Sequence, residues 1–234
     1  MASPPLMPYL HGLRLAVTDG ASALALFERV FAAPLAEPAS PRDTARWPRL
    51  QLGGPWLELR AAPGDTLDLR CRDLARQRTH LQRLGIEPLD GMALGCTPCL
   101  RLEAVDTGAC TVDLREAAPA SAHDTTPTRG VRLCSLTLSV RSPERVALHW
   151  AQLFHAPSGR DAHGLPALAL GRFDLRFALA SDGVSAVTGL DFSVDDMDAV
   201  LRDATSHGLS IRRQGTRHAA FDACGIRFVV RPVL

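Results

Sequence analysis

The feature of this sequence that most limits its possible folds is one order of elements that occurs four times. Each unit opens with a strand of alternating apolar and polar residues, continues with an amphipathic helix and ends in a hairpin. The opening strands are expected at 11–19, 66–73, 131–140 and 187–194, and the helices at 21–31, 74–84, 146–154 and from 197 to Gly208. The hairpins are expected around Gly53–Gly54, Thr107–Gly108 and Gly171 and within 218–230, with a short strand before each, for example at 210–213. Strands with one apolar face need helices on that face, so the pattern predicts an α+β fold with a polar concave face.

One segment interrupts the repeat. Residues 117–130 (AAPASAHDTTPTRG) are small, polar and rich in proline and threonine, which is typical of a linker. We therefore predict a domain at 8–117, a linker at 118–129 and a second domain at 130–234, with two units in each domain.

Charge and cysteine usage exclude several classes of function. All 26 basic residues are arginine, which excludes a lysine Schiff base and a P-loop lysine. The net charge of +1 gives no electrostatic footprint for nucleic acid or for an anionic membrane. The sequence has no apolar run of about 18 residues and no recognisable signal peptide, so we expect a cytoplasmic protein with free thiols. The expected partner is a small-molecule ligand, and the expected state is a monomer or a homodimer.

Several pieces of the repeat resemble a known superfamily. The segments VTDGASALALFERVFAAPL and SVRSPERVALHWAQLFHAP resemble one strand–helix pattern, and RDLARQRTHLQRLGI and VDDMDAVLRDATSHGLSI resemble that of the partner unit. FDACGIRFVV resembles the closing hairpin. These patterns are similar to the βαβββ modules of the vicinal oxygen chelate (VOC) superfamily, which includes glyoxalase I, bleomycin-resistance and fosfomycin-resistance proteins and extradiol dioxygenases. The resemblance implies four modules in two glyoxalase-like domains, with curved mixed sheets and helices on their convex sides.

The resemblance also implies where a metal ion would bind. Metal-dependent members place ligands on the first strand of a module, often His, and on its last strand, usually Glu. Here these positions hold Gly12 and Glu58, Thr66 and Asp113, Ser135 and Arg176, and Gly189 and Val229. His11 adjoins the first position, but strand alternation points it away from the cup. We therefore expect no metal in the second domain, and only Glu58 and Asp113, with Thr66, as weak candidates for a divalent ion in the first.

Alternation brings charged residues to the concave face of the first domain. The predicted ligand-binding residues are Arg14, Trp56, Glu58, Arg60, Arg70, Arg101 and Asp113. Arginine forks bind carboxylate or phosphate, and an indole offers a stacking face. The alternatives are a solvated face with internal salt bridges and an interface with a partner. The concave face of the second domain is milder, and His218 is the histidine expected to face it.

Three functions remain open from the sequence. The first is metal-free binding of a small polar or anionic molecule, as in the bleomycin-resistance proteins. The second is a metal-dependent lyase, isomerase or dioxygenase that uses Glu58 and Asp113, which would share a proton if they lie close together. The third is a non-catalytic protein that binds a partner through a sheet face. The sequence does not decide whether the protein is an enzyme.

Overall fold

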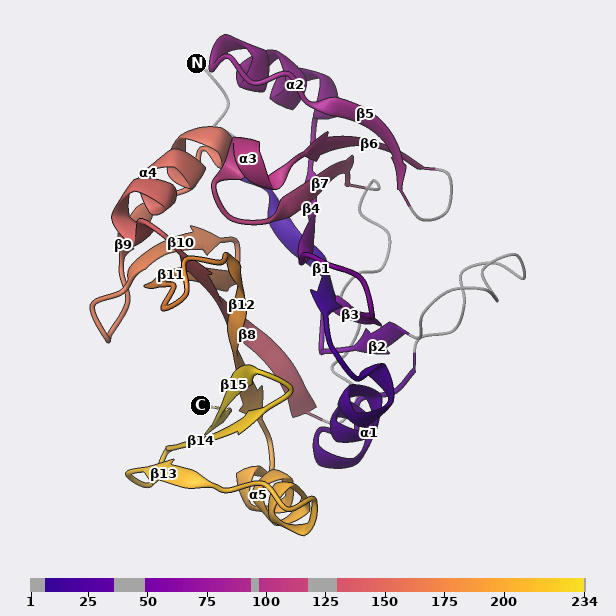
Figure 1. The fold of residues 1–234 in the computed structure, drawn as a ribbon, viewed down its shortest axis with the longest axis vertical. Coiled ribbons are helices and arrows are strands. Elements are labelled where there is room, and N and C mark those ends of the chain that lie inside the picture. The colour runs from indigo at the N-terminus through magenta and orange to yellow at the C-terminus, as the bar shows by residue number, and fades with distance from the viewer. Residues whose placement is uncertain (1–6, 36–48, 94–96, 118–129, 234) are drawn as a thin grey trace.

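The structure is a computed structural model that describes residues 7–35, 49–93, 97–117 and 130–233 (Figure 1). The predicted linker, 118–129, lies outside the described residues. The strands of the N-terminal half are β1 (Tyr9–Ala16), β2 (Arg49–Gln51), β3 (Trp56–Arg60), β4 (Thr66–Cys71), β5 (Leu89–Ala93), β6 (Thr97–Leu102) and β7 (Thr111–Glu116). Those of the C-terminal half are β8 (Val131–Val140), β9 (Ser158–Arg160), β10 (Pro166–Leu170), β11 (Phe173–Leu179), β12 (Ala186–Val194), β13 (Arg212–Gln214), β14 (His218–Ala223) and β15 (Ile226–Pro232).

Each half of the chain forms one mixed sheet, as the α+β prediction requires. The strand orders are β2-β3-β1-β4-β7-β6-β5 and β13-β14-β15-β12-β8-β11-β10-β9. The opening strands of two units pair antiparallel at the centre of each sheet, β1 with β4 and β8 with β12. Each opening strand also pairs in parallel with the closing strand of its own unit. Sequence-adjacent units therefore share a sheet, a pairing that the sequence left open.

The helices begin and end where the local sequence favours it. They are α1 (Gly20–Val30), α2 (Leu74–Arg83), α3 (Ala104–Thr107), α4 (Pro143–Phe154) and α5 (Met197–Ser206). The side chains of Asp19, Asp73 and Asp196 accept backbone N–H bonds at the starts of α1, α2 and α5. Gly85 and Gly208 follow α2 and α5 with φ of +79° and +78°, a conformation that suits glycine.

The core lies between the two sheets, and helices from opposite halves meet at its ends. Figure 1 shows α1 beside α5 at one end, and α2 and α3 near α4 at the other. Phe27 and Phe31, at α1, contact the rings of Phe192, Phe221 and Phe228 from the C-terminal half. At the opposite end the buried indole of Trp150 donates a hydrogen bond of 2.8 Å to the carbonyl oxygen of Thr107. Because the apolar faces point inward, the polar faces of both sheets point away from each other.

Three local details differ from the sequence predictions. The hairpin expected around Thr107–Gly108 is formed by β6 and β7, which pair antiparallel, but its connection contains the helix α3, which begins after Glu103, whose N–H donates to the Asp106 carboxylate. The short strand expected before the hairpin of the first unit is a single bridge from Leu35 to Leu50, and the segment between these two residues includes residues outside the description. The short strand expected at 210–213 is β13, which begins two residues later. None of the described helices is long and apolar enough to cross a membrane.

Candidate functional site

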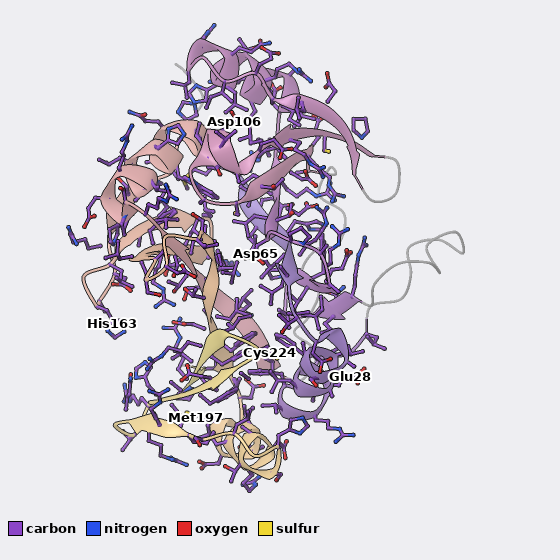
Figure 2. The ribbon with its side chains drawn as sticks, in the orientation of Figure 1. Glu28, Asp65, Asp106, His163, Met197 and Cys224 are labelled. Carbon is purple, nitrogen blue, oxygen red and sulfur yellow. The ribbon has the colours of Figure 1, made fainter. Side chains whose placement is uncertain are left out.

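The concave face of the C-terminal sheet encloses a cavity of about 610 Å³. Its lining comes from β8, β11, β12, β14 and β15, from Gln214 of β13, and from the loop between β9 and β10 that carries Asp161 and His163. His163 projects on the outer side of the C-terminal half in Figure 2. Small-molecule sites commonly measure roughly 300–1,000 Å³, so this cavity has the size of a ligand site.

Arg176 lies at the centre of this cavity, on β11. Its Nη2 atom is 2.6 Å from Asp191 Oδ2 and 2.7 Å from Ser135 Oγ, and its Nη1 atom is 3.6 Å from Asp161 Oδ2. The other oxygen of Asp161 accepts the N–H groups of His163 and Leu165 at 2.9 and 2.8 Å, which fixes the loop. Two carboxylates and a hydroxyl therefore hold one buried guanidinium in a fixed orientation.

The opposite side of the cavity carries cations of a different kind. Arg227 and Arg231 line it from β15, with Val229 between them, and His218 lines it from β14. In the described part of the chain neither Arg227 nor Arg231 forms an ion pair or a side-chain hydrogen bond. These two exposed guanidiniums are available to an anionic group that enters the cavity.

The concave face of the N-terminal sheet holds two neighbouring groups of ion-paired charges, which we together call the arginine network. Its members are Arg14, Arg49, Arg60, Arg70, Arg101, Arg115, Glu58, Asp68 and Asp113. Asp113 accepts from Arg101 at 2.8 and 3.1 Å and from Arg14 at 2.8 Å. Glu58 lies 3.3 Å from Arg49 and 3.6 Å from Arg60. All three carboxylates are buried beneath the guanidiniums.

The arginines of the network fix the protonation of Asp113. Burial by itself raises the pKa of this carboxyl, but the hydrogen bonds and charges of Arg101 and Arg14 outweigh it, and the pKa falls below its ordinary value. Asp113 is thus held ionised, which does not suit the proton-sharing base considered for Glu58 and Asp113. For Arg115 the environment disfavours the charged form instead. Burial lowers its pKa to about 10, and the charges of Arg14 and Arg49 lower it further.

Trp56 lies against β1 at the first of the positions considered for a metal ligand. A Cβ atom at Gly12 would lie 2.0 Å from the indole Cε2 atom, so the ring occupies the space of a side chain there. The guanidinium carbons of Arg49 and Arg14 lie 4.9 and 5.8 Å from the indole centroid. His11 was expected to point away from the cup, and this is wrong. The register of β1 shifts between Leu10 and Gly12, and the His11 ring packs edge-on against Trp56 at 6.3 Å.

Comparisons with known proteins address this architecture. No protein-family model matches the sequence, and no curated protein matches it. A Mn(II)-bound glyoxalase from Novosphingobium aromaticivorans has a TM-score of 0.67 at 13% identity, over 97% of this chain and 82% of that one. A catechol 2,3-dioxygenase has a TM-score of 0.68 at 11% identity, over 97% and 93% of the two chains. The chain has the vicinal oxygen chelate fold.

A further match is to a longer protein. A fusion of a xylose isomerase-like TIM barrel with a 4-hydroxyphenylpyruvate dioxygenase has a TM-score of 0.61 at 18% identity. The match covers 98% of this chain, which spans 50% of the length of that protein. All three likenesses establish the fold, and the chemistry must be argued from the residues present.

The residues at the VOC ligand positions do not fit a metal chelate. In the N-terminal sheet the indole fills the place at Gly12, and guanidiniums engage both candidate carboxylates, Glu58 and Asp113. In the C-terminal sheet Arg176 places a positive charge at one position, and Gly189 and Val229 offer no ligand atom in their side chains. Among the described residues no three His, Cys, Asp or Glu side chains are grouped so that they could hold a metal ion.

The structure brings the residues predicted as the site into one network, but it does not place them around the C-terminal cavity. Arg14, Trp56, Glu58, Arg60, Arg70, Arg101 and Asp113 all belong to, or contact, the arginine network. Ser135, Arg176 and His218 were named for the second cup from the sequence, but Asp161 was missed. The available signal was the sequence Asp161-Ala-His-Gly, which is typical of a turn that aspartate closes with its own side chain.

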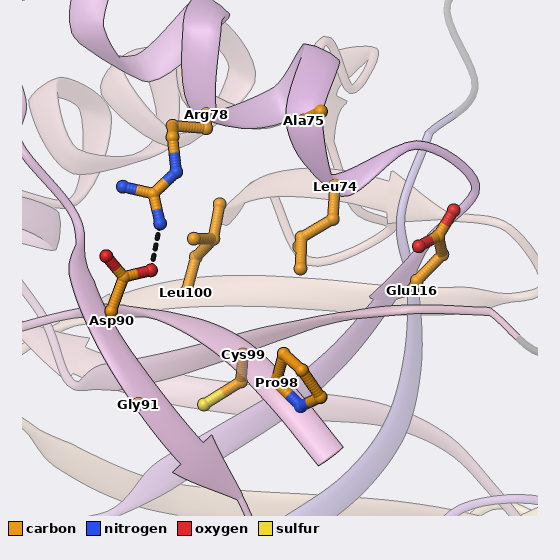
Figure 3. A pocket seen from close by; sticks show the side chains of 9 residues that line it. All are labelled: Leu74, Ala75, Arg78, Asp90, Gly91, Pro98, Cys99, Leu100 and Glu116. Atoms are coloured by element: carbon orange, nitrogen blue, oxygen red, sulfur yellow. Dashed lines mark hydrogen bonds and ion pairs between the residues drawn. The ribbon is translucent and has the colours of Figure 1, made fainter.

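A second cavity lies on the other face of the N-terminal sheet. It measures about 460 Å³ and lies between α2 and the strands β5 and β6 (Figure 3). Leu74, Leu100 and Pro98 form its apolar wall, and Arg78 contacts Asp90 across it. Its lining has few polar groups directed at a common point, so the C-terminal cavity is the stronger candidate.

Proposed function

We propose that this protein binds a small polar molecule with an anionic group in the C-terminal cavity, without a metal chelate at the VOC ligand positions. The observation that carries the proposal is the cavity itself, built around a fixed guanidinium and bordered by two unpaired ones. Asp161 and Asp191 are already engaged by Arg176, so Arg227 and Arg231 are the groups that would hold the anion. The hydroxyls of Ser135 and Thr137 would orient polar atoms of the ligand.

Two other functions make different demands on the protein. The structural neighbours include a Mn(II)-bound glyoxalase and a catechol dioxygenase, and a related activity here would need a divalent metal. Arg176 argues against that chemistry in the C-terminal cup, because it places a cation where the metal would bind. A partner-binding role would need a protein surface rather than a cavity as its recognition element.

The experiment combines metal analysis with a ligand screen. Protein purified without chelators is analysed for bound transition metals and then screened by thermal shift against small carboxylates, phosphates and amino acids. We expect no stoichiometric metal, and a ligand whose stabilisation is lost in the double variant Arg227→Gln/Arg231→Gln. The matched control is Arg212→Gln/Arg213→Gln, which removes two exposed, ion-paired arginines from β13. A stoichiometric metal, or equal ligand binding by both double variants, would overturn the proposal.

A further inference from the structure

The arginine network of the N-terminal sheet has more positive than negative charge. One connected part of it joins Arg14, Arg70, Arg101 and Arg115 to only two carboxylates, Asp68 and Asp113. Arg14 links the two carboxylates, because it lies 2.8 Å from Asp113 and 3.7 Å from Asp68. These six side chains carry four positive and two negative charges, an excess of two.

The register of the strands explains why these charges cannot pair completely. In the parallel ladder of β4 and β7, Asp68 lies beside Asp113, and Arg70 lies beside Arg115. Like charges are therefore neighbours in both rows, and Asp68 serves three guanidiniums, those of Arg14, Arg70 and Arg115. Neighbouring like charges destabilise a sheet unless a counter-charge lies between them.

Unused hydrogen-bond donors lie at the same place. The Nε atoms of Arg70 and Arg115 are buried and have no hydrogen-bond partner among the described residues, and neither has Asp68 Oδ1, which lies 4.0 Å from Arg70 Nε. Arg115 itself is 4% exposed, so a nearly inaccessible cation retains a free donor. A buried, unpaired donor costs roughly 1–3 kcal/mol, and a charged one costs more. An acceptor that reached these donors would remove this cost.

The part of the network that solvent can reach is positive. The side chain of Arg101 is 42% exposed and that of Arg70 is 17% exposed, whereas those of Asp68 and Asp113 are 0% exposed. A ligand that approaches this face contacts the exposed guanidiniums first, because the carboxylates are buried beneath them. Burial also lowers the pKa of Arg70 and of Arg115.

We propose that this face is a second binding site, separate from the C-terminal cavity, for a small oxyanion that carries two negative charges. Arg70 and Arg101 would contact the anion directly, and Arg115 and Arg14 would add their charge from below. A dianion matches the excess of two charges, and its several oxygens suit guanidinium forks. Phosphate, sulfate and short dicarboxylates share this chemistry. The site shares no residue with the proposed C-terminal site, so either proposal can fail alone.

The test compares dianions with monoanions at constant ionic strength. Phosphate, sulfate and malonate are titrated against acetate and chloride at pH 7.5, with the melting temperature and the intrinsic tryptophan fluorescence, to which the nearby Trp56 contributes, as readouts. We expect saturable stabilisation by at least one dianion and none by the monoanions. The dianion that stabilises the protein at the lowest concentration shows whether the ligand resembles phosphate or sulfate or is a dicarboxylate. Equal stabilisation by monoanions would reduce the effect to screening and overturn the proposal.

Variants locate the effect. Arg70→Gln/Arg101→Gln should weaken dianion binding by about tenfold or more, since each arginine supplies charged hydrogen bonds. The control Arg212→Gln/Arg213→Gln removes the same charge from the other half and should bind like the wild type. If the first double variant does not fold, Arg70→Lys is tested instead. This variant keeps the positive charge but removes the guanidinium fork, so it should still weaken dianion binding. Unchanged binding in the folded variants would also overturn the proposal.

Discussion

The carboxylate of Asp65 joins the two halves of the protein, and its replacement by asparagine tests the reasoning on buried polar groups. Asp65 lies between the halves in Figure 2 and is 8% exposed. One oxygen accepts the N–H of Ala16 at the end of β1 at 2.8 Å, and the other accepts the N–H of Val187 in β12 at 2.7 Å. The amide nitrogen of asparagine has no lone pair to accept with, so Asp65→Asn leaves one of these N–H groups facing a donor.

The magnitude follows from that lost bond. An unsatisfied buried N–H costs roughly 1–3 kcal/mol, and removal of the desolvated charge offsets part of it, so we expect a loss of about 1–2 kcal/mol at pH 7.5. For a chain of this size the melting temperature should fall by roughly 2–4 °C per kcal/mol. Urea denaturation at 25 °C measures the loss. Asp182→Asn is the control, since Asp182 accepts the N–H of Val184 in an exposed turn and should change stability by less than about 0.5 kcal/mol.

The pH dependence gives a second, independent check. Burial raises the pKa of Asp65 above its ordinary value of 3.8, although both N–H bonds oppose the shift. The native state then binds a proton more tightly than the unfolded state, so the contribution of Asp65 to stability grows as the pH falls through the raised pKa towards 3.8. A protonated carboxyl oxygen can still accept a bond, whereas the amide nitrogen cannot. The stability gap between wild type and Asp65→Asn should therefore widen on acidification. A gap that is absent at pH 7.5, or that closes as the pH falls, would refute this account.

Three further predictions concern single groups. Gly12→Ala should displace the Trp56 indole, lower stability by about 1–3 kcal/mol and shift the tryptophan emission, because the new methyl would lie 2.0 Å from the ring. Gly189→Ala, whose Cβ would lie 3.1 Å from Thr137, is the milder control. An equal loss of stability in both variants would contradict the reasoning. Trp150→Phe should cost about 1–3 kcal/mol in urea denaturation, because it leaves the Thr107 carbonyl without its donor, and a variant of wild-type stability would count against that bond. Burial raises the pKa of the Cys71 thiol to about 11. Cys71 should therefore react with a disulfide reagent at pH 8 far more slowly in the native than in the unfolded protein, and comparison with Cys71→Ala identifies which reacting thiol is Cys71.

The sheets could be predicted because the leucines fix which face of each strand is buried. Leu13, Leu57, Leu69 and Leu114 are all 0% exposed, so their polar neighbours had to face the other way. This reasoning placed Arg14, Glu58 and Asp113 on one surface before any coordinates. It failed at His11, where the shift of register in β1 breaks the alternation on which the prediction relied.

Other features depend on contacts that periodicity does not encode. The meeting of α1 with α5 joins opposite ends of the sequence, and helix periodicity says only that each has an apolar face. The C-terminal cavity depends on the loop that Asp161 closes and on the ion pairs of Arg176. The sequence showed the charges of both cups. Only the distances show that each carboxylate of the N-terminal cup lies within 4.0 Å of a guanidinium, whereas Arg227 and Arg231 of the C-terminal cup have no ion pair among the described residues.

The two cups share one consequence despite their different residues. In each, carboxylates contact guanidiniums at or beside the positions where the VOC resemblance places metal ligands: the partly buried Asp161 and Asp191 around Arg176, and the buried Asp113 beside Arg14 and Arg101. A guanidinium keeps its charge and presents fixed N–H forks, so it can bind and orient an oxyanion, but it has no open coordination position with which to polarise a substrate oxygen as a Lewis acid would. An arginine at such a position therefore favours recognition of an anion over metal-dependent chemistry. The proposed binding of a polar anion in the C-terminal cup and of a dianion in the N-terminal cup both follow from this property of arginine.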